Sequence, residues 1–332
     1  MMKLSTILLL TSYLVAFAET EERVNKRFAV QPEGTLRVDI DFGAIEVSTN
    51  ASNQVIVDVV RKVTRETKAD EEAYLKERPI TFSQQGNSVK IQSRAKSTVS
   101  LSTHARQRTE GKFTIAVPSH FNAQLKTSGG AIAVSDLNGE VNSKTSGGTL
   151  TFTRLHGPLD GRTGGGNVRI DDCQGDLKVK TSGGGIDVSG GSGSLNGDTA
   201  GGSIIVKTFG GPVHVGSSGG GIEIENVTGK VEGSTSGGSI SAKFSSPLAD
   251  EVKLKTSGGS IMVRLPESSA FDLDASTSGG KVSSDLPLGA PATAARRDVR
   301  GRLSGKLKGP VNGGGKPVVL HSGGGSIQVK KL

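Results

Sequence analysis

Residues 127–144 read TSGGAIAVSDLNGEVNSK, and residues 145–162 read TSGGTLTFTRLHGPLDGR. TSGG or a close variant begins a further unit at residues 163, 181, 199, 217, 235, 256, 277 and 321. The first seven starts are separated by intervals of 18 residues, and the later intervals are 21, 21 and 44. A low-complexity tract would not keep so constant a spacing, so the sequence predicts an internal repeat with one structural unit per period.

Apolar residues recur at fixed positions of each unit. Positions 6 and 8 are apolar and alternate with polar neighbours, which is typical of a strand with one buried face. Position 6 is occupied by Ile132, Leu150, Val168, Ile186, Ile204, Ile222, Ile240, Ile261 and Val282. Position 15 is apolar too, from Val141 to Val231. Helical spacing is missing, so each unit is predicted to form two short strands, at about positions 5–9 and 14–18.

A unit of 18 residues cannot bury its own apolar face, but units stacked about 4.8 Å apart form parallel sheets in which equivalent side chains lie on one another. The sequence therefore predicts an all-β fold, a single-stranded parallel β-helix (solenoid) with 18-residue coils and irregular N- and C-terminal caps. Its interior should be one side chain wide, because Val, Ile and Leu fill the repeat and the chain has no Trp.

The TSGG motif is predicted to form a corner of each coil. Glycine reaches the positive-φ conformations that tight turns demand, and the Thr and Ser hydroxyls can form hydrogen bonds along the stack. The glycine at position 13, for example Gly139, is predicted to form a second corner. A phosphate-binding loop is a weaker interpretation, because such loops precede helices and here strands follow.

The first 18 residues have the features of a secretory signal peptide. Lys3 is followed by an apolar run over residues 4–17, and Ala16 and Ala18 form a small-residue cleavage site. The run is shorter than the about 20 apolar residues of a membrane span, and no later segment is apolar enough to be one. We therefore expect no transmembrane segment in the mature protein, which would be exported and be periplasmic, attached to the cell surface or secreted.

Four regions are predicted along the chain: the signal peptide (1–18), N-terminal coils and cap with one short helix (19–125), the regular repeat (126–284), and a loop with C-terminal coils (285–332). DFGAIEV at residues 41–47 is a degenerate TSGGxIxV motif, so the first coil is expected there. The helix is predicted over residues 66–78, before Pro79. After a loop that ends near Arg300, the chain is predicted to add a final pair of coils. Because an open sheet edge invites further chains to pair, the irregular ends are expected to be caps.

Charge and cysteine content limit the possible functions. Without Lys3 of the signal, 39 Lys and Arg face 32 Asp and Glu, a modest excess that favours anionic surfaces. A single cysteine, Cys173, excludes an intramolecular disulfide, and its apolar repeat position predicts a buried residue. The five histidines have no metal-ligand spacing, so neither a metal nor a cofactor is expected; they are His104, His120, His156, His214 and His321.

Two charged groups are candidate sites. Lys126, Lys144, Arg162 and Lys180 all precede the TSGG corner, so stacking would place four cations about 4.8 Å apart. Like charges in register repel, so these residues either extend into water or bind an anion, such as an anionic polysaccharide or an envelope polymer. Nucleic acid is not expected, because aromatic residues for base stacking are scarce. Asp171 and Asp172, with Asp187, Glu223 and Glu225, form an acidic cluster that is either solvated or, as glycoside hydrolysis requires, catalytic.

The motifs FGAIEV, FTIAVPSHFNAQLKTSGGAIAVSDLNG, the repeated TSGGxIxV and LKGPVNGGGKPVVLHSGGGSIQV resemble the bacterial putative-adhesin family of unknown function, which is related to auto-transporter adhesin head domains. The resemblance spans residues 35–332 and implies an exported β-helix without catalytic residues. We therefore expect a non-catalytic protein that presents an extended binding surface, adhesin-like or structural in the cell envelope. The alternatives are a polysaccharide-active enzyme and an envelope assembly or stress factor that binds another protein along a sheet edge. The oligomeric state is left open.

Overall fold

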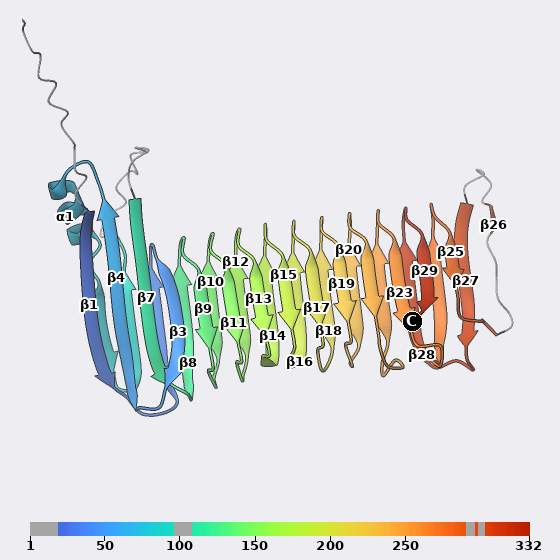
Figure 1. Cartoon of the computed structure of the whole chain (residues 1–332), viewed down its shortest axis with the longest axis horizontal. Coiled ribbons are helices and arrows are strands. Elements are labelled where there is room, and N and C mark those ends of the chain that lie inside the picture. The colour runs from blue at the N-terminus through green and yellow to red at the C-terminus, as the bar shows by residue number, and fades with distance from the viewer. Residues whose placement is uncertain (1–18, 96–107, 290–295, 298–302) are drawn as a thin grey trace, which may run out of the picture.

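The computed structural model describes residues 19–95, 108–289, 296–297 and 303–332. The predicted signal peptide, most of the polar stretch before residue 108 and most of the Arg-containing loop before residue 303 lie outside these ranges. Within them the chain forms two long, mostly parallel sheets and one helix, α1 (Lys68–Glu77). The predicted all-β solenoid is confirmed (Figure 1).

Each sheet runs the length of the stack. Sheet A contains, in spatial order, β1 (Glu19–Ala29), β4 (Gln54–Thr64), β7 (Arg108–Pro118), β3 (Ala44–Asn50), β9 (Ile132–Ser135), β11 (Leu150–Thr153), β13 (Val168–Asp171), β15 (Ile186–Ser189), β17 (Ile204–Lys207), β19 (Ile222–Glu225), β21 (Ile240–Lys243), β23 (Ile261–Leu265), β29 (Ile327–Lys331) and β25 (Val282–Ser284). Sheet B contains, in spatial order, β26 (Arg296–Arg297), β27 (Leu303–Val311), β24 (Phe271–Thr277), β28 (Lys316–Ser322), β22 (Val252–Thr256), β20 (Val231–Thr235), β18 (Val213–Ser217), β16 (Ser192–Thr199), β14 (Gln174–Thr181), β12 (Leu159–Thr163), β10 (Val141–Thr145), β8 (Phe121–Thr127), β2 (Gly34–Ile40), β6 (Ser88–Ser93) and β5 (Thr81–Gln85).

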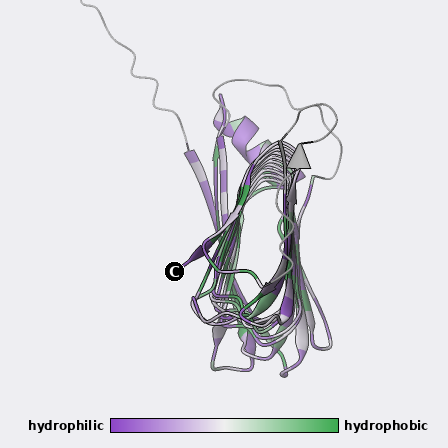
Figure 2. Ribbon diagram, turned by 90° about the vertical axis from the view of Figure 1, so that its right-hand side faces the viewer, coloured by the Kyte–Doolittle hydropathy of each residue, from purple (hydrophilic) through white to green (hydrophobic). Residues whose placement is uncertain are grey.

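The repeat period sets the strand register. Leu150 pairs with Val168 and Val141 pairs with Leu159, so each residue of the regular coils lies beside its equivalent 18 positions away. The strands occupy positions 6–9 and 15 to the first residue of the next unit, close to the predicted positions. The buried apolar residues of both sheets form one continuous core. Figure 2, which looks along the stack, shows the two sheets facing each other. Only a narrow layer of side chains separates the sheets, which matches the aliphatic composition.

The TSGG corner differs from its predicted mechanism. Its glycines are not among the positive-φ residues, which instead include Gly139 at position 13 (φ 154°) and Asp136 at position 10 (φ 62°). The second glycine of the motif is required by close approach: a Cβ on Gly148 would lie 2.0 Å from the carbonyl oxygen of Gly130. The stacked hydrogen bonds were predicted correctly. Thr145 donates from Oγ1 to the carbonyl of Gly130 (2.8 Å) and accepts from the amide of Gly148 (3.2 Å).

The chain does not add its coils strictly in sequence order. Strands β28 and β29 form one coil, which lies between the coil of β22 and β23 and the coil of β24 and β25. The prediction of a final pair of coils is therefore wrong, because β27 turns back antiparallel to β24 and lies outside it in sheet B, followed only by the two-residue strand β26. At the other end β6 and β7 lie outside β2 and β3, which precede them in the sequence. Both sheets at the N-terminal end, and sheet B at the C-terminal end, thus finish with antiparallel strands, as expected for caps, whereas sheet A ends there with β25, parallel to β29.

The predicted helix forms at the N-terminal cap. Thr67 is its N-cap and accepts a hydrogen bond from the amide of Asp70 (3.2 Å). Glu71 is fully buried and ties the helix to β1 through the hydroxyl of Thr20 (2.5 Å). The rings of Phe28 on β1 and Phe82 on β5 lie 6.2 Å apart, so the outermost strands of the two sheets meet there. Among the described residues, no helix has the length and apolar character needed to cross a membrane.

Candidate functional site: a basic groove on the outer face of sheet B

The four cations before the corner lie side by side on the outer face of sheet B. Lys126 is paired in register with Lys144, Lys144 with Arg162, and Arg162 with Lys180. They belong to β8, β10, β12 and β14, and all four are exposed. The row ends in carboxylates on both sides, since Asp39 of β2 is paired with Lys126 and Asp198 of β16 with Lys180.

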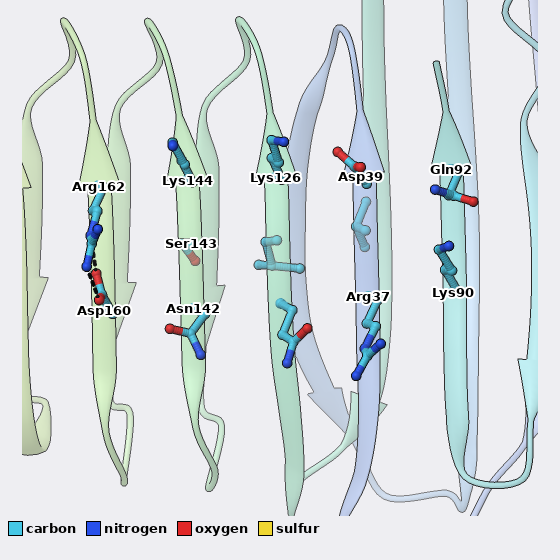
Figure 3. Close-up of a pocket in the computed structure, with 13 residues that line it drawn as sticks. Arg37, Asp39, Lys90, Gln92, Lys126, Asn142, Ser143, Lys144, Asp160 and Arg162 are labelled. Carbon is cyan, nitrogen blue, oxygen red and sulfur yellow. Dashed lines mark hydrogen bonds and ion pairs between the residues drawn. The ribbon is translucent and has the colours of Figure 1, made fainter. Parts of the chain in front are cut away.

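A shallow groove of about 580 Å³ crosses this face from β6 to β12 (Figure 3). Lys126, Lys144 and Arg162 line it, whereas Lys180 lies beyond its end. Two further cations line it that were not predicted, Arg37 of β2 and Lys90 of β6. Neither has a place in the 18-residue repeat. Strand β6 comes beside β2 only because the chain doubles back at the N-terminal cap.

Only one groove cation is neutralised by a groove carboxylate. Arg162 donates from Nε and Nη2 to the carboxylate of Asp160 (2.8 and 2.6 Å), and this hydrogen bond raises the pKa of Arg162. The second carboxylate, Asp39, pairs with Arg94, whose pKa the contact also raises. In the described part of the chain, the other four cations form no ion pair; they are Arg37, Lys90, Lys126 and Lys144.

The groove is extended along the solenoid rather than closed around a point. Its polar lining comes from two outward rows, one containing Arg37, Gln124 and Asn142 and the other Asp39, Lys126 and Lys144. Residues of the intervening row, such as Val38 and Leu125, complete the lining. Neighbouring strands lie about 4.8 Å apart, so the cations repeat at about that distance across the groove. This arrangement suits an extended anion that crosses the strands.

The acidic residues of sheet A are interspersed with basic, polar and apolar residues. In the register, Asp171 lies opposite Ser189, and Asp187 lies between Arg169 and Ile205. Lys207 separates this part of the face from Glu225 and contacts Glu223 at 3.9 Å. Asp172 lies at the corner, in the left-handed region (φ 49°). No group of three metal-ligating side chains occurs among the described residues.

The remaining candidate residues have structural surroundings. Cys173 is buried, as predicted, and burial raises the pKa of its thiol. His214 lies 3.1 Å from a carboxylate oxygen of Glu232, and His321 lies 3.1 Å from the hydroxyl of Ser276. His120 and His156 form backbone bridges between coils, while His104 lies outside the described residues.

Comparison with solved structures finds similar chains in several bacteria. A "putative lipid binding protein" from Parabacteroides distasonis is 12% identical, with 93% of this chain and 96% of that chain covered and a TM-score of 0.34. A "putative adhesin" from Bacteroides fragilis is 14% identical, with 94% and 97% covered and a TM-score of 0.29. A "putative cell adhesion protein" from Clostridium sporogenes is 13% identical, with 94% and 100% covered and a TM-score of 0.19.

A search of curated proteins finds no match. A family model, in contrast, matches residues 37–329, which include every regular coil, β28 and the start of β29 in the inserted coil, and all the residues that line the groove. On this match the chain belongs to the Toastrack DUF4097 family.

Proposed function

We propose that this protein is an exported, non-catalytic β-helix that binds an anionic polysaccharide or envelope polymer in the groove on the outer face of sheet B. The observation that carries the proposal is a group of four groove cations that form no ion pair with any residue that the structure describes, Arg37, Lys90, Lys126 and Lys144. An adhesin-like or structural role in the cell envelope follows from binding of this kind.

Electrostatics favours a polymer over a small anion. Like charges held on adjacent strands repel one another, and this repulsion is a cost to the folded state unless water or a counter-charge screens it. A polymer with regularly spaced negative groups would neutralise several cations with one ordered chain. Binding would release counterions and weaken as the salt concentration rises, as for other polyanions.

The catalytic alternative has less support. Glycoside hydrolysis uses two carboxylates that flank one bond. In the register, Ser189, Arg169 and Lys207 are interspersed among the acidic residues of sheet A, so the cluster is of mixed charge. For the basic groove of sheet B, the alternative outcomes of the binding test are that it is a solvent-exposed surface without a ligand or that it binds a protein partner.

The test measures binding of residues 19–332 to a polyuronate, a phosphate-bearing glycan and a neutral glucan over a salt series. In the groove variant Arg37, Lys90, Lys126 and Lys144 are all changed to Gln. The control variant carries the same charge change at the other end of sheet B, in Lys253, Lys255, Lys306 and Lys308. We expect the groove variant to lose about tenfold or more in affinity, and the control less than about twofold.

Two results would contradict the proposal. Equal losses of affinity in both variants would show that binding responds to net charge alone. If the unmodified protein bound none of the polymers, the groove would be a solvated surface without a polyanionic ligand. Arg162→Gln adds a finer test. Because Asp160 already neutralises Arg162, this change should weaken binding less than Lys144→Gln does.

A further inference from the structure

We propose that two copies of this chain associate face to face through the outer face of sheet A, about a two-fold axis that runs parallel to the strands between β17 and β19. This inference is independent of the groove on sheet B and of its ligand. It rests on the sequence of charges along sheet A, which becomes complementary to itself when the order of strands is reversed.

The face consists of ten parallel strands that form an uninterrupted run. From the N-terminal side they are β9, β11, β13, β15 and β17, followed by β19, β21, β23, β29 and β25. Five strands therefore lie on each side of the axis. The inserted C-terminal coil contributes β29 to this face, so the symmetry depends on a strand whose position the order of the sequence does not predict.

Outward charges differ between the two halves of the face. Toward the N-terminal side, the carboxylates Asp171 and Asp187 are exposed on β13 and β15. Toward the C-terminal side, three cations are paired in register on β21, β23 and β29, namely Lys243, Arg264 and Lys330. These three cations have no ion pair within the described residues.

Reversal about the axis brings opposite charges together. A two-fold axis parallel to the strands keeps each row of side chains facing the same row of the partner. Strand β17 then faces β19, which places Lys207 against the partner's Glu225. Strand β13 faces β23, which places Asp171 against the partner's Arg264. Strand β15 faces β21, and Asp187 lies diagonal to the partner's Lys243.

No two like charges are placed directly opposite in these rows. Arg169 faces the partner's Met262, and Ile205 faces the partner's Glu223, which is 3.9 Å from Lys207 of its own chain. A shallow groove of about 500 Å³ also lies on this face, between β17 and β23. Its lining includes the half-buried side chains of Ile205 and Met262 and a series of serines, a smooth and mostly uncharged surface that a second flat sheet can approach.

The area is sufficient for a specific dimer. Ten strands about 4.8 Å apart, most with four residues at about 3.3 Å, make a face of about 630 Å². Specific interfaces bury about 600–1,000 Å² on each partner, so this face lies at the lower end of that range. The association would leave sheet B of both copies facing outward on opposite sides, so the groove of each copy would stay accessible to a ligand.

The test uses the charge pair that is least confounded by contacts within one chain. Asp171 and Arg264 lie five strand spacings apart in the same sheet, about 24 Å, so they cannot meet within a monomer. Sedimentation equilibrium of the unmodified residues 19–332 should show a dimer that weakens with added salt. Asp171→Arg and Arg264→Asp should each raise the dimer dissociation constant about tenfold or more, because symmetry creates two repulsive contacts in each variant.

Mixing the two variants provides the decisive measurement. The arginine at position 171 of one chain then faces the aspartate at position 264 of the other, and the unchanged residues form the second attractive pair. The heterodimer should therefore have a dissociation constant about tenfold or more below that of either variant homodimer. Matched changes on sheet B, Asp198→Arg and Lys253→Asp, should leave the dimer intact. A monomer at every concentration, a dimer indifferent to the sheet A variants, or a mixture that stays monomeric would each overturn the proposal.

Discussion

At the scale of single residues, the repeat is maintained by backbone contacts between coils. The motif TSGG predicts glycine corners, and the assignment of a corner was right. Sequence reasoning attributed the glycines to positive φ, whereas the structure attributes the second glycine to contact with the coil below. Either cause requires glycine at the same positions of the sequence, so the sequence does not distinguish them. The structure shows which of the two glycines has no room for a side chain.

The two glycines of one motif provide a matched pair of substitutions. In Gly148→Ala the new Cβ would lie 2.0 Å from the carbonyl oxygen of Gly130, whereas in Gly147→Ala its nearest neighbour, the carbonyl oxygen of Gly129, is 4.0 Å away. Backbone cannot yield as a flexible side chain can, so we expect Gly148→Ala to lower the free energy of unfolding by about 3 kcal/mol or more. Gly147→Ala should change it by no more than about 0.5 kcal/mol.

Urea unfolding followed by circular dichroism measures both. A similar small effect of the two substitutions would show that the coils can move apart at this corner. Similar large effects would instead indicate that the corner conformation, which both glycines share, is the main constraint.

At the scale of elements, the sequence predicts strands better than it predicts their neighbours. Alternating apolar residues identify a strand whichever strand lies beside it, so the inserted coil of β28 and β29 produces the same pattern as a terminal coil. The candidate site shows the same limit. Lys126, Lys144, Arg162 and Lys180 could be aligned from the period, but Arg37 and Lys90 join the groove through pairings of β2 with β6 and β8. Nothing in the local pattern encodes these pairings.

Because the coil of β28 and β29 is inserted between two others, we expect a destabilising substitution in β28 to destabilise the neighbouring strands as well. Leu320 is fully buried on β28, between β22 and β24, so Leu320→Ala should cost about 2–5 kcal/mol. Hydrogen exchange measured by mass spectrometry should show lost protection in β24 and β27 as well as in β28, because β28 joins β24 to the rest of sheet B. Leu307→Ala, on β27 outside β24, should affect β27 mainly. Unchanged exchange in β24 of the Leu320 variant would contradict the importance of the insertion.

At the scale of the whole molecule, the solenoid is a one-dimensional stack in which each coil contacts its two neighbours. Length can then change by whole coils without a change of fold. Residues 199–216 form one complete period, and their removal joins Asp198 to Ser217, which has the same corner role as Thr199. In the native chain Ser217 donates to the carbonyl of Gly202, and in the shortened chain it would lie above Gly184.

Deletion of residues 199–216 should therefore yield a folded protein with one coil fewer. Circular dichroism should keep the β-sheet spectrum and a cooperative thermal transition. Deletion of residues 199–207 alone should not fold, because it removes β17 while leaving β18 and shifts every later strand out of its sheet. Equal folding of both deletions would contradict the one-dimensional description.

The same deletion separates the two surfaces proposed for this molecule. The groove lies on β6, β2, β8, β10 and β12, all outside the deleted coil, so polyanion binding by a single chain should be unchanged. Sheet A, however, would have nine regular strands in place of ten. If Asp171 still faced the partner's Arg264, the two-fold axis would pass through β19, and β19 would face β19 of the partner. Glu223 and Glu225 would oppose the same residues of the partner, and like charges in such positions repel.

The shortened protein should thus bind polymer as a monomer, which sedimentation with and without the polymer would measure. Retention of the dimer would place the association on a surface other than sheet A.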